Sequence, residues 1–201
     1  MMNYPSAASG LKMMLIAQIL NIVGSVVIVL GLILTVVTIG ILFFIPLLGS
    51  LLVFAGGVVG LMGLFKASAD DEGYRGALVF AGINVVVSAL SGTLGENASI
   101  LHTLLLIVSS ILTFLVVNTV CQTTGNLLHS MGKDDLAERG STVSKLYLIC
   151  TAVTVVCTLV GAIPVLGVLA GVVSFASSIV SLVGYVLYLG FLYSGGRALE
   201  Y

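Results

Sequence analysis

Long apolar runs alternate along the chain with short segments that hold most of its charged residues and its prolines. A helix must run about 20 residues to cross a hydrocarbon core of roughly 30 Å, and six runs are of about this length. These runs lack the alternation of apolar and polar positions that membrane β-strands show. We therefore predict an all-α fold in which six transmembrane helices form three hairpins and one bundle domain, 1–201. The predicted spans are 12–40, 46–65, 74–92, 99–125, 144–160 and 164–194.

The composition supports this prediction. Of the 201 residues, 59% are hydrophobic and 7% are charged, whereas about a quarter of the residues of a soluble domain are charged. Such a chain cannot cover a water-facing surface, so the lipid bilayer is its first predicted partner. The net charge of −1 offers phosphates little attraction, which excludes a nucleic-acid-binding protein.

The cations predict the orientation. With six spans, all seven fall in one compartment: Lys12, Lys66, Arg75, Lys133, Arg139, Lys145 and Arg197. Because Lys and Arg beside spans are retained in the cytoplasm, we expect both termini there. The predicted external loops, 41–45, 93–98 and 161–163, hold one charged residue, Glu96. No cation precedes the first apolar run, so 12–40 is expected to remain as an anchor.

An internal repeat is also predicted. A shift of 118 residues places the segment 45–49 (IPLLG) on 163–167 (IPVLG), so the first and third hairpins look related. Pro46 and Pro164 each suit the first turn of a helix. Small residues four apart, such as Gly56 and Gly60, are typical of close helix packing in membranes. Packing within one chain is the simpler interpretation, and a homo-oligomer is the alternative.

Two cytoplasmic segments carry most of the charge. One is 70–75, and the other runs from His129 to Lys145. In the second segment we predict a short helix over 133–139 that ends at Gly140, with Ser141 capping the fifth span. A solvated connector is the simpler interpretation of 129–140, and the alternative is a docking surface for a cytoplasmic protein partner.

Three short segments carry a resemblance. These are 8–12 (ASGLK), 72–77 (EGYRGA) and 137–140 (AERG). With them the whole chain resembles uncharacterised six-span membrane proteins of clostridial-type Gram-positive bacteria. The resemblance implies a multi-pass protein of the bacterial plasma membrane, and it implies no particular activity.

The residues that usually carry chemistry are sparse. Away from their ends, the predicted spans contain no Asp, Glu, Lys or Arg, which argues against a proton- or sodium-driven pump. His102 and His129 fall on opposite sides of the membrane, and the three cysteines have no metal-binding spacing. We predict no catalytic residues, no metal site and no cofactor, and hence no enzyme.

A polar layer is the remaining candidate site. At 1.5 Å per residue, one polar side chain on each of five spans lies about 14 to 18 Å from the inner boundary. The five are Asn21, Asn84, Asn118, Thr154 and Tyr185. An amide without a partner in hydrocarbon costs several kcal/mol, so we expect these groups to face inward. They either fix the packing by bonding to one another or line a pocket for a neutral polar solute, which Gln18 and Gln122 extend toward the cytoplasm.

Two functions follow from these features. The first is a non-enzymatic membrane subunit or scaffold that acts through its cytoplasmic loops. The second is a component that binds or transports a small neutral solute. In size such a component resembles the six-helix subunits of vitamin importers, although the aromatic-rich binding loops expected of them are missing and the chain has no Trp.

Overall fold

The computed structural model describes residues 4–37, 44–94, 99–161 and 167–200. Within these ranges the chain is helical apart from residue 4 and the turns 68–72, 131–133 and 199–200, with no strand. The described residues form six helices, which confirms the all-α prediction. They are α1 (Pro5–Val37), α2 (Phe44–Ala67), α3 (Gly73–Leu94), α4 (Ser99–Ser130), α5 (Asp134–Gly161) and α6 (Gly167–Ala198). Pro164 and Glu96 lie outside the described residues.

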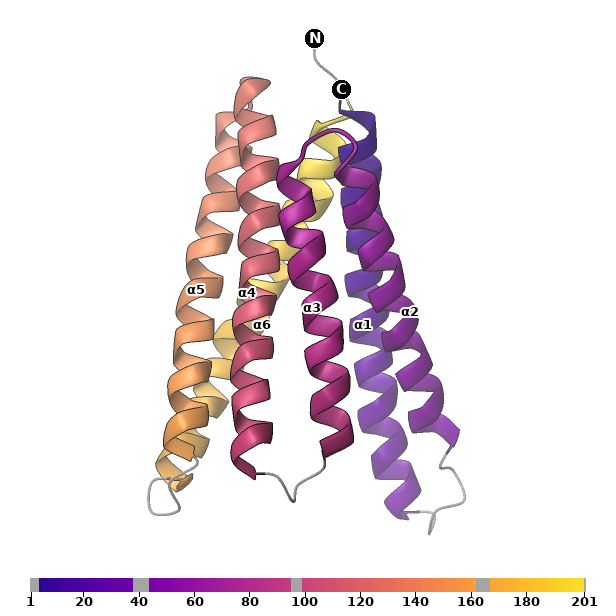
Figure 1. Ribbon diagram of the computed structural model, residues 1–201, viewed down its shortest axis with the longest axis vertical. Helices are drawn as coiled ribbons and strands as arrows, with labels where there is room; N and C mark the ends of the chain where they lie inside the picture. The colour runs from indigo at the N-terminus through magenta and orange to yellow at the C-terminus, as the bar shows by residue number, and fades with distance from the viewer. Residues whose placement is uncertain (1–3, 38–43, 95–98, 162–166, 201) are drawn as a thin grey trace.

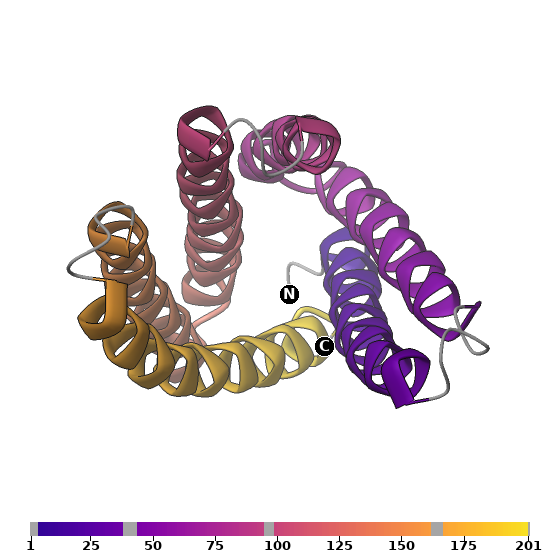
Figure 2. The same ribbon diagram turned by 90° about the horizontal axis from the view of Figure 1, so that it is seen from below.

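The helices form a ring in chain order. They run roughly side by side, with both termini at one end of the bundle (Figure 1). Seen along the bundle, α6 slants from α5 back to α1 and closes the ring (Figure 2), and α1 contacts α6 as well as α2. The helices lie closer together at the end that holds the termini than at the opposite end (Figure 1).

The outer surface of the bundle is apolar. Large hydrophobic side chains point outward along the helices, among them Phe54 (71% exposed) and Ile100 (78% exposed). Among the residues that the structure describes, five helices are long and apolar enough to cross a membrane: α1, α2, α3, α4 and α5. Surfaces of this kind are covered by lipid tails rather than by water, which is consistent with a multi-pass membrane protein.

Glycines seven residues apart join α1 to α2. On α1 the small residues Gly10, Ala17, Gly24 and Gly31 are buried, and on α2 Gly49, Gly56 and Gly63 are buried. A Cβ added to Gly24 would lie 2.8 Å from the carbonyl oxygen of Gly49, and one added to Gly63 would lie 2.8 Å from that of Gly10. The two backbones are therefore in contact along this line, which we call the glycine seam. A seven-residue repeat keeps one face of each helix on its partner, as in coiled coils.

The main hydrophobic core lies toward the end that holds the termini. Its fully buried members lie near the ends of several helices and include Leu11, Tyr74, Leu128 and Leu192. Within it, the Tyr74 hydroxyl and Oγ1 of Thr124 share a hydrogen bond of 2.8 Å, which ties the start of α3 to α4. Both side chains are completely buried. This core holds the ring together where the helices converge.

The same end carries the described ion pairs. Lys12 pairs with Glu200, Arg75 with Glu72 and His129 with Asp134. We call this end, with the turns 68–72 and 131–133, the charged end. Additional bonds tie the termini to these turns, because the amide N–H of Ala7 donates to Asp70 (2.7 Å) and the Lys133 ammonium donates to the carbonyl of Ala198.

The prediction of a short helix that ends at Gly140 is wrong. The helix α5 begins at Asp134 and continues through Gly140 and Ser141 to Gly161. A Cβ at position 140 would lie 2.8 Å from the Phe191 ring and 3.2 Å from the carbonyl oxygen of Cys121, so this glycine serves close packing and not helix termination. The segment 129–140 is consequently mostly helical and not a loop.

The helix α4 continues beyond the predicted membrane span, which ends at residue 125. It ends at Ser130, and Gly132 follows it with φ of 72°. The Lys133 amide donates to the Leu128 carbonyl and the Gly132 amide to the His129 carbonyl, which is the usual hydrogen-bond pattern at a glycine-terminated helix end. Helices therefore extend beyond the apolar runs into the charged end.

Two packing predictions have different outcomes. Pro46 lies in the first turn of α2, as expected. Gly56 and Gly60 both face Ala17 of α1, so this pair of small residues packs within the chain. The homo-oligomer and the hairpin repeat stay predictions.

Candidate functional site

A cavity of about 290 Å³ lies inside the ring. We call it the central cavity. Five helices line it: Met14, Ala17, Gln18 and Asn21 of α1, Gly56, Gly57, Gly60, Leu61 and Leu64 of α2, Ala81, Asn84 and Val85 of α3, Thr113, Val116 and Val117 of α4, and Tyr188 of α6. Its wall is mostly apolar, and no Asp, Glu, Lys, Arg or His is among these residues.

Asn21 is the least satisfied polar group in this cavity. Its Oδ1 is buried and has no hydrogen-bond partner, although an amide oxygen accepts up to two hydrogen bonds. Oδ1 lies against Gly56, where an added Cβ would collide with it. Gly56 of the glycine seam thus leaves space for the Asn21 amide, whose oxygen accepts no hydrogen bond from the described residues.

Asn84 is in the same cavity, but its amide is paired. Its Nδ2 donates to Oγ1 of Thr113 at 3.1 Å, and its Oδ1 accepts from Oγ of Ser109 at 2.7 Å. Thr113 in turn donates to the Ser109 carbonyl at 2.9 Å. These bonds tie α3 to α4 on one side of the cavity, so Asn84 has both a structural role and a place in the wall.

Tyr185 reaches the cavity through Gln18. Its hydroxyl lies 2.6 Å from Oε1 of Gln18 and 3.0 Å from the Gln18 carbonyl oxygen, so it links α6 to α1. Tyr185 does not line the central cavity, whereas Gln18 does. Among the described residues, the amide nitrogen of Gln18 has no hydrogen-bond partner, which leaves a donor group on the α1 wall.

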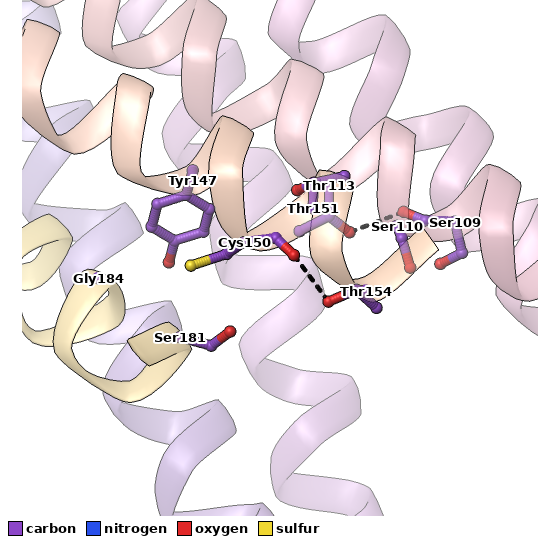
Figure 3. Close-up of a pocket in the computed structure, with 9 residues that line it drawn as sticks. All are labelled: Ser109, Ser110, Thr113, Tyr147, Cys150, Thr151, Thr154, Ser181 and Gly184. Atoms are coloured by element: carbon purple, nitrogen blue, oxygen red, sulfur yellow. Dashed lines mark hydrogen bonds between the residues drawn. The ribbon is translucent and has the colours of Figure 1, made fainter. Parts of the chain in front are cut away.

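Thr154 lines a second cavity of about 220 Å³ between α4, α5 and α6. Figure 3 shows Tyr147 and Cys150 of α5 facing Ser181 and Gly184 of α6 across it. The Thr154 hydroxyl donates to the Cys150 carbonyl at 2.9 Å within its own helix. Thr113 lines both cavities, so the two adjoin at α4.

Asn118 lies apart from both cavities. Its Oδ1 accepts hydrogen bonds from Oγ of Ser144 at 2.5 Å and from Nε2 of Gln122 at 3.1 Å. It therefore joins α4 to α5, and its amide oxygen is satisfied there. Gln122, expected to extend the pocket toward the cytoplasm, donates to Asn118, whereas Gln18 lines the central cavity.

The five predicted polar residues thus separate into three settings. Asn21 and Asn84 share the central cavity, Thr154 lines the second cavity, and Tyr185 and Asn118 join helices. Sequence reasoning missed Thr113 and Ser109, which complete the bonding of Asn84. Their signal was a pair of hydroxyl residues four apart on α4 at the depth of Asn84, which places them on one helix face.

Among the described residues, no group of three or more His, Cys, Asp or Glu side chains is placed to hold a metal ion. Cys121, Cys150 and Cys157 are buried and unpaired. The close pair of His129 and Asp134, at 2.5 Å, is exposed at the charged end.

Comparison with protein-family models, with curated proteins and with solved structures finds no match for this chain.

Proposed function

We propose that the chain is a multi-pass membrane protein whose central cavity binds a small neutral polar solute, either for transport or for delivery to a partner subunit. The observation that carries this proposal is the buried Oδ1 of Asn21, which has no partner and borders a cavity. A buried polar atom without a partner costs about 1–3 kcal/mol. A solute that donates a hydrogen bond to Oδ1 of Asn21 removes this cost, and the free energy regained favours binding.

The cavity wall defines the solute class. The absence of charged side chains among its lining residues favours a neutral solute, because an ion would enter without a counter-charge. Its volume of about 290 Å³ is at the lower end of ligand sites, which span about 300–1,000 Å³. The Asn21 oxygen accepts and the Gln18 nitrogen donates, so the solute carries both a donor and an acceptor, as small amides, ureas and polyols do.

We infer the orientation from the charges. Lys66, Arg75, Lys133 and Arg197 lie at or within one turn of the helix ends at the charged end, whereas Lys145 lies 11 residues into α5. Both termini lie at the charged end as well (Figure 1). Because cations beside spans are retained in the cytoplasm, we assign the charged end to the cytoplasm and the protein to a plasma membrane. The central cavity then lies on the membrane side of the main hydrophobic core.

A ligand screen tests the proposed site. The purified protein in detergent is heated with urea, small amides, glycerol and neutral sugars, and the affinity of any stabilising compound is measured by calorimetry. Asn21→Leu is expected to weaken binding at least about tenfold, because one buried hydrogen bond contributes on the order of 1.4 kcal/mol. The matched control is Asn118→Leu, which removes an amide outside the cavity and should leave affinity unchanged. Equal affinity in wild type and Asn21→Leu would remove the site.

A membrane subunit or scaffold is the second candidate function. The exposed side chains of Asp135, Glu138 and Arg139 border a groove of about 520 Å³ between α5 and α6 at the charged end. A cytoplasmic protein that docks on this end would contact them. If this function is correct, a cross-linker attached at position 138 should capture a partner protein in native membranes. Solute binding alone does not require such a partner.

A further inference from the structure

A groove of about 880 Å³ opens on the outside of the bundle near the charged end. We call it the α2–α3 groove. Apolar side chains form its floor, and Lys66, Ser68 and Arg75 lie at its polar edge. The apolar members are Met13, Leu61, Met62, Phe65, Ala69 and Leu78. Met62 and Phe65 are 57% and 70% exposed, so the groove faces the surroundings of the bundle and not its core.

The cations at this edge retain capacity to bind an anion. Lys66 makes no ion pair among the described residues. Arg75 donates from Nη1 to Glu72 at 3.0 Å, but a guanidinium has five N–H donors, and both partners of this pair are largely exposed.

The other nearby carboxylates are engaged elsewhere. Asp70 accepts from the Ala7 amide at 2.7 Å, and Asp71 accepts from the Gly73 amide at 2.6 Å. The Ser68 hydroxyl donates to the Phe65 carbonyl within its helix. Of the three acidic residues in this turn, Glu72 alone pairs with a groove cation, which leaves the ammonium of Lys66 and part of the Arg75 guanidinium for a ligand.

We propose that the α2–α3 groove binds an anionic phospholipid, with its phosphate between Lys66 and Arg75 and an acyl chain along the apolar floor. Two cations next to an exposed apolar trough match the two parts of such a molecule, and basic pockets between membrane helices bind anionic head groups in this way. The proposal depends on membrane insertion and not on solute binding in the central cavity, so each can fail without the other.

Tryptophan fluorescence tests the assignment, because the chain contains no Trp and a single introduced Trp reports on its own surroundings. Phe65→Trp is reconstituted in phosphatidylcholine vesicles that contain either brominated phosphatidylglycerol or brominated phosphatidylcholine, and quenching gives the relative association of the two lipids. We expect phosphatidylglycerol to be favoured at least about fivefold, the contribution of one cation near a membrane surface. Met62→Trp provides a second reporter if the first variant does not fold.

The matched control removes the two positive charges of the α2–α3 groove and leaves its apolar side chains in place. In the Phe65→Trp background, Lys66→Gln with Arg75→Gln should reduce the preference to less than about twofold, and Lys66→Gln alone should reduce it in part. Equal association of both lipids before these changes, or an unaltered preference after them, would overturn the proposal. Relief of quenching by excess inorganic phosphate would also overturn it, because the site would then take a free anion rather than a lipid.

Discussion

Gly24→Ala should destabilise the protein by about 1–3 kcal/mol, the usual cost of forcing extra atoms into a packed contact. The added Cβ would lie 2.8 Å from the Gly49 carbonyl oxygen and 2.9 Å from the Val53 backbone nitrogen. Backbone atoms cannot rotate away as the end of a side chain can, so the two helices must separate. The expected readout is a lower midpoint of thermal unfolding, followed by circular dichroism in detergent.

Gly57→Ala is the matched control for this prediction. Gly57 lies on α2, the other helix of the glycine seam, but an added Cβ at this position meets nothing within 4 Å. Since Ala is favoured over Gly in a helix by about 0.8–1.0 kcal/mol, this variant should be as stable as wild type or slightly more stable. Similar effects of the two substitutions would mean that α1 and α2 are not in backbone contact.

When no solute is present, Asn84→Leu should destabilise the protein, whereas Asn21→Leu should leave its stability unchanged or raise it. Asn84→Leu removes the acceptor of Ser109 and one bond of Thr113, and bonds between membrane helices contribute about 0.6 kcal/mol on average and up to about 1.7 kcal/mol. Asn21→Leu replaces a buried oxygen without a partner by an apolar group of similar shape, which is neutral or stabilising.

The comparison requires the same thermal unfolding assay for both variants, without added solutes. A loss of stability in Asn21→Leu as large as that in Asn84→Leu would show that the Asn21 amide is satisfied in the empty protein. The driving force proposed for solute binding would then be absent. A gain or no change in Asn21→Leu, together with its weakened binding, would assign this residue to function at the expense of stability.

The helices were predictable from the sequence because lipid imposes a strong requirement. Every backbone group in the hydrocarbon must bond internally and every side chain must tolerate lipid, so long apolar runs mark helices. The ends were less predictable at the charged end. There the predicted fourth span ends at Gly125 and the predicted short helix ends at Gly140, but both glycines lie inside helices. At Gly140 the ring of Phe191 occupies the space that a side chain would need.

The sequence predicted the height of the polar residues along their helices, but it did not predict which way each side chain faces. Counting 1.5 Å per residue placed Asn21 and Asn84 at one height, and they do line one cavity. The same count placed Asn118 at that height, although it faces Ser144 on α5. Which way a residue faces depends on how its helix is rotated against its neighbours, and this rotation is set by long-range contacts. The glycine seam contains that information for α1 and α2, but its small residues repeat every seven positions, whereas the pattern used to predict packing was small residues four apart.

The most direct test of the account is the position of the charged end relative to the membrane, because every depth and both proposed sites depend on it. Single cysteines replace Arg75, Lys133, Arg197 and Glu96, and an impermeant thiol reagent is applied to intact cells, with wild type as the control for its three buried cysteines. We predict that position 96 reacts in intact cells and that the other three react after the membrane is made permeable. Reaction of positions 75, 133 and 197 in intact cells would invert the orientation, and a division among those three would contradict six crossings.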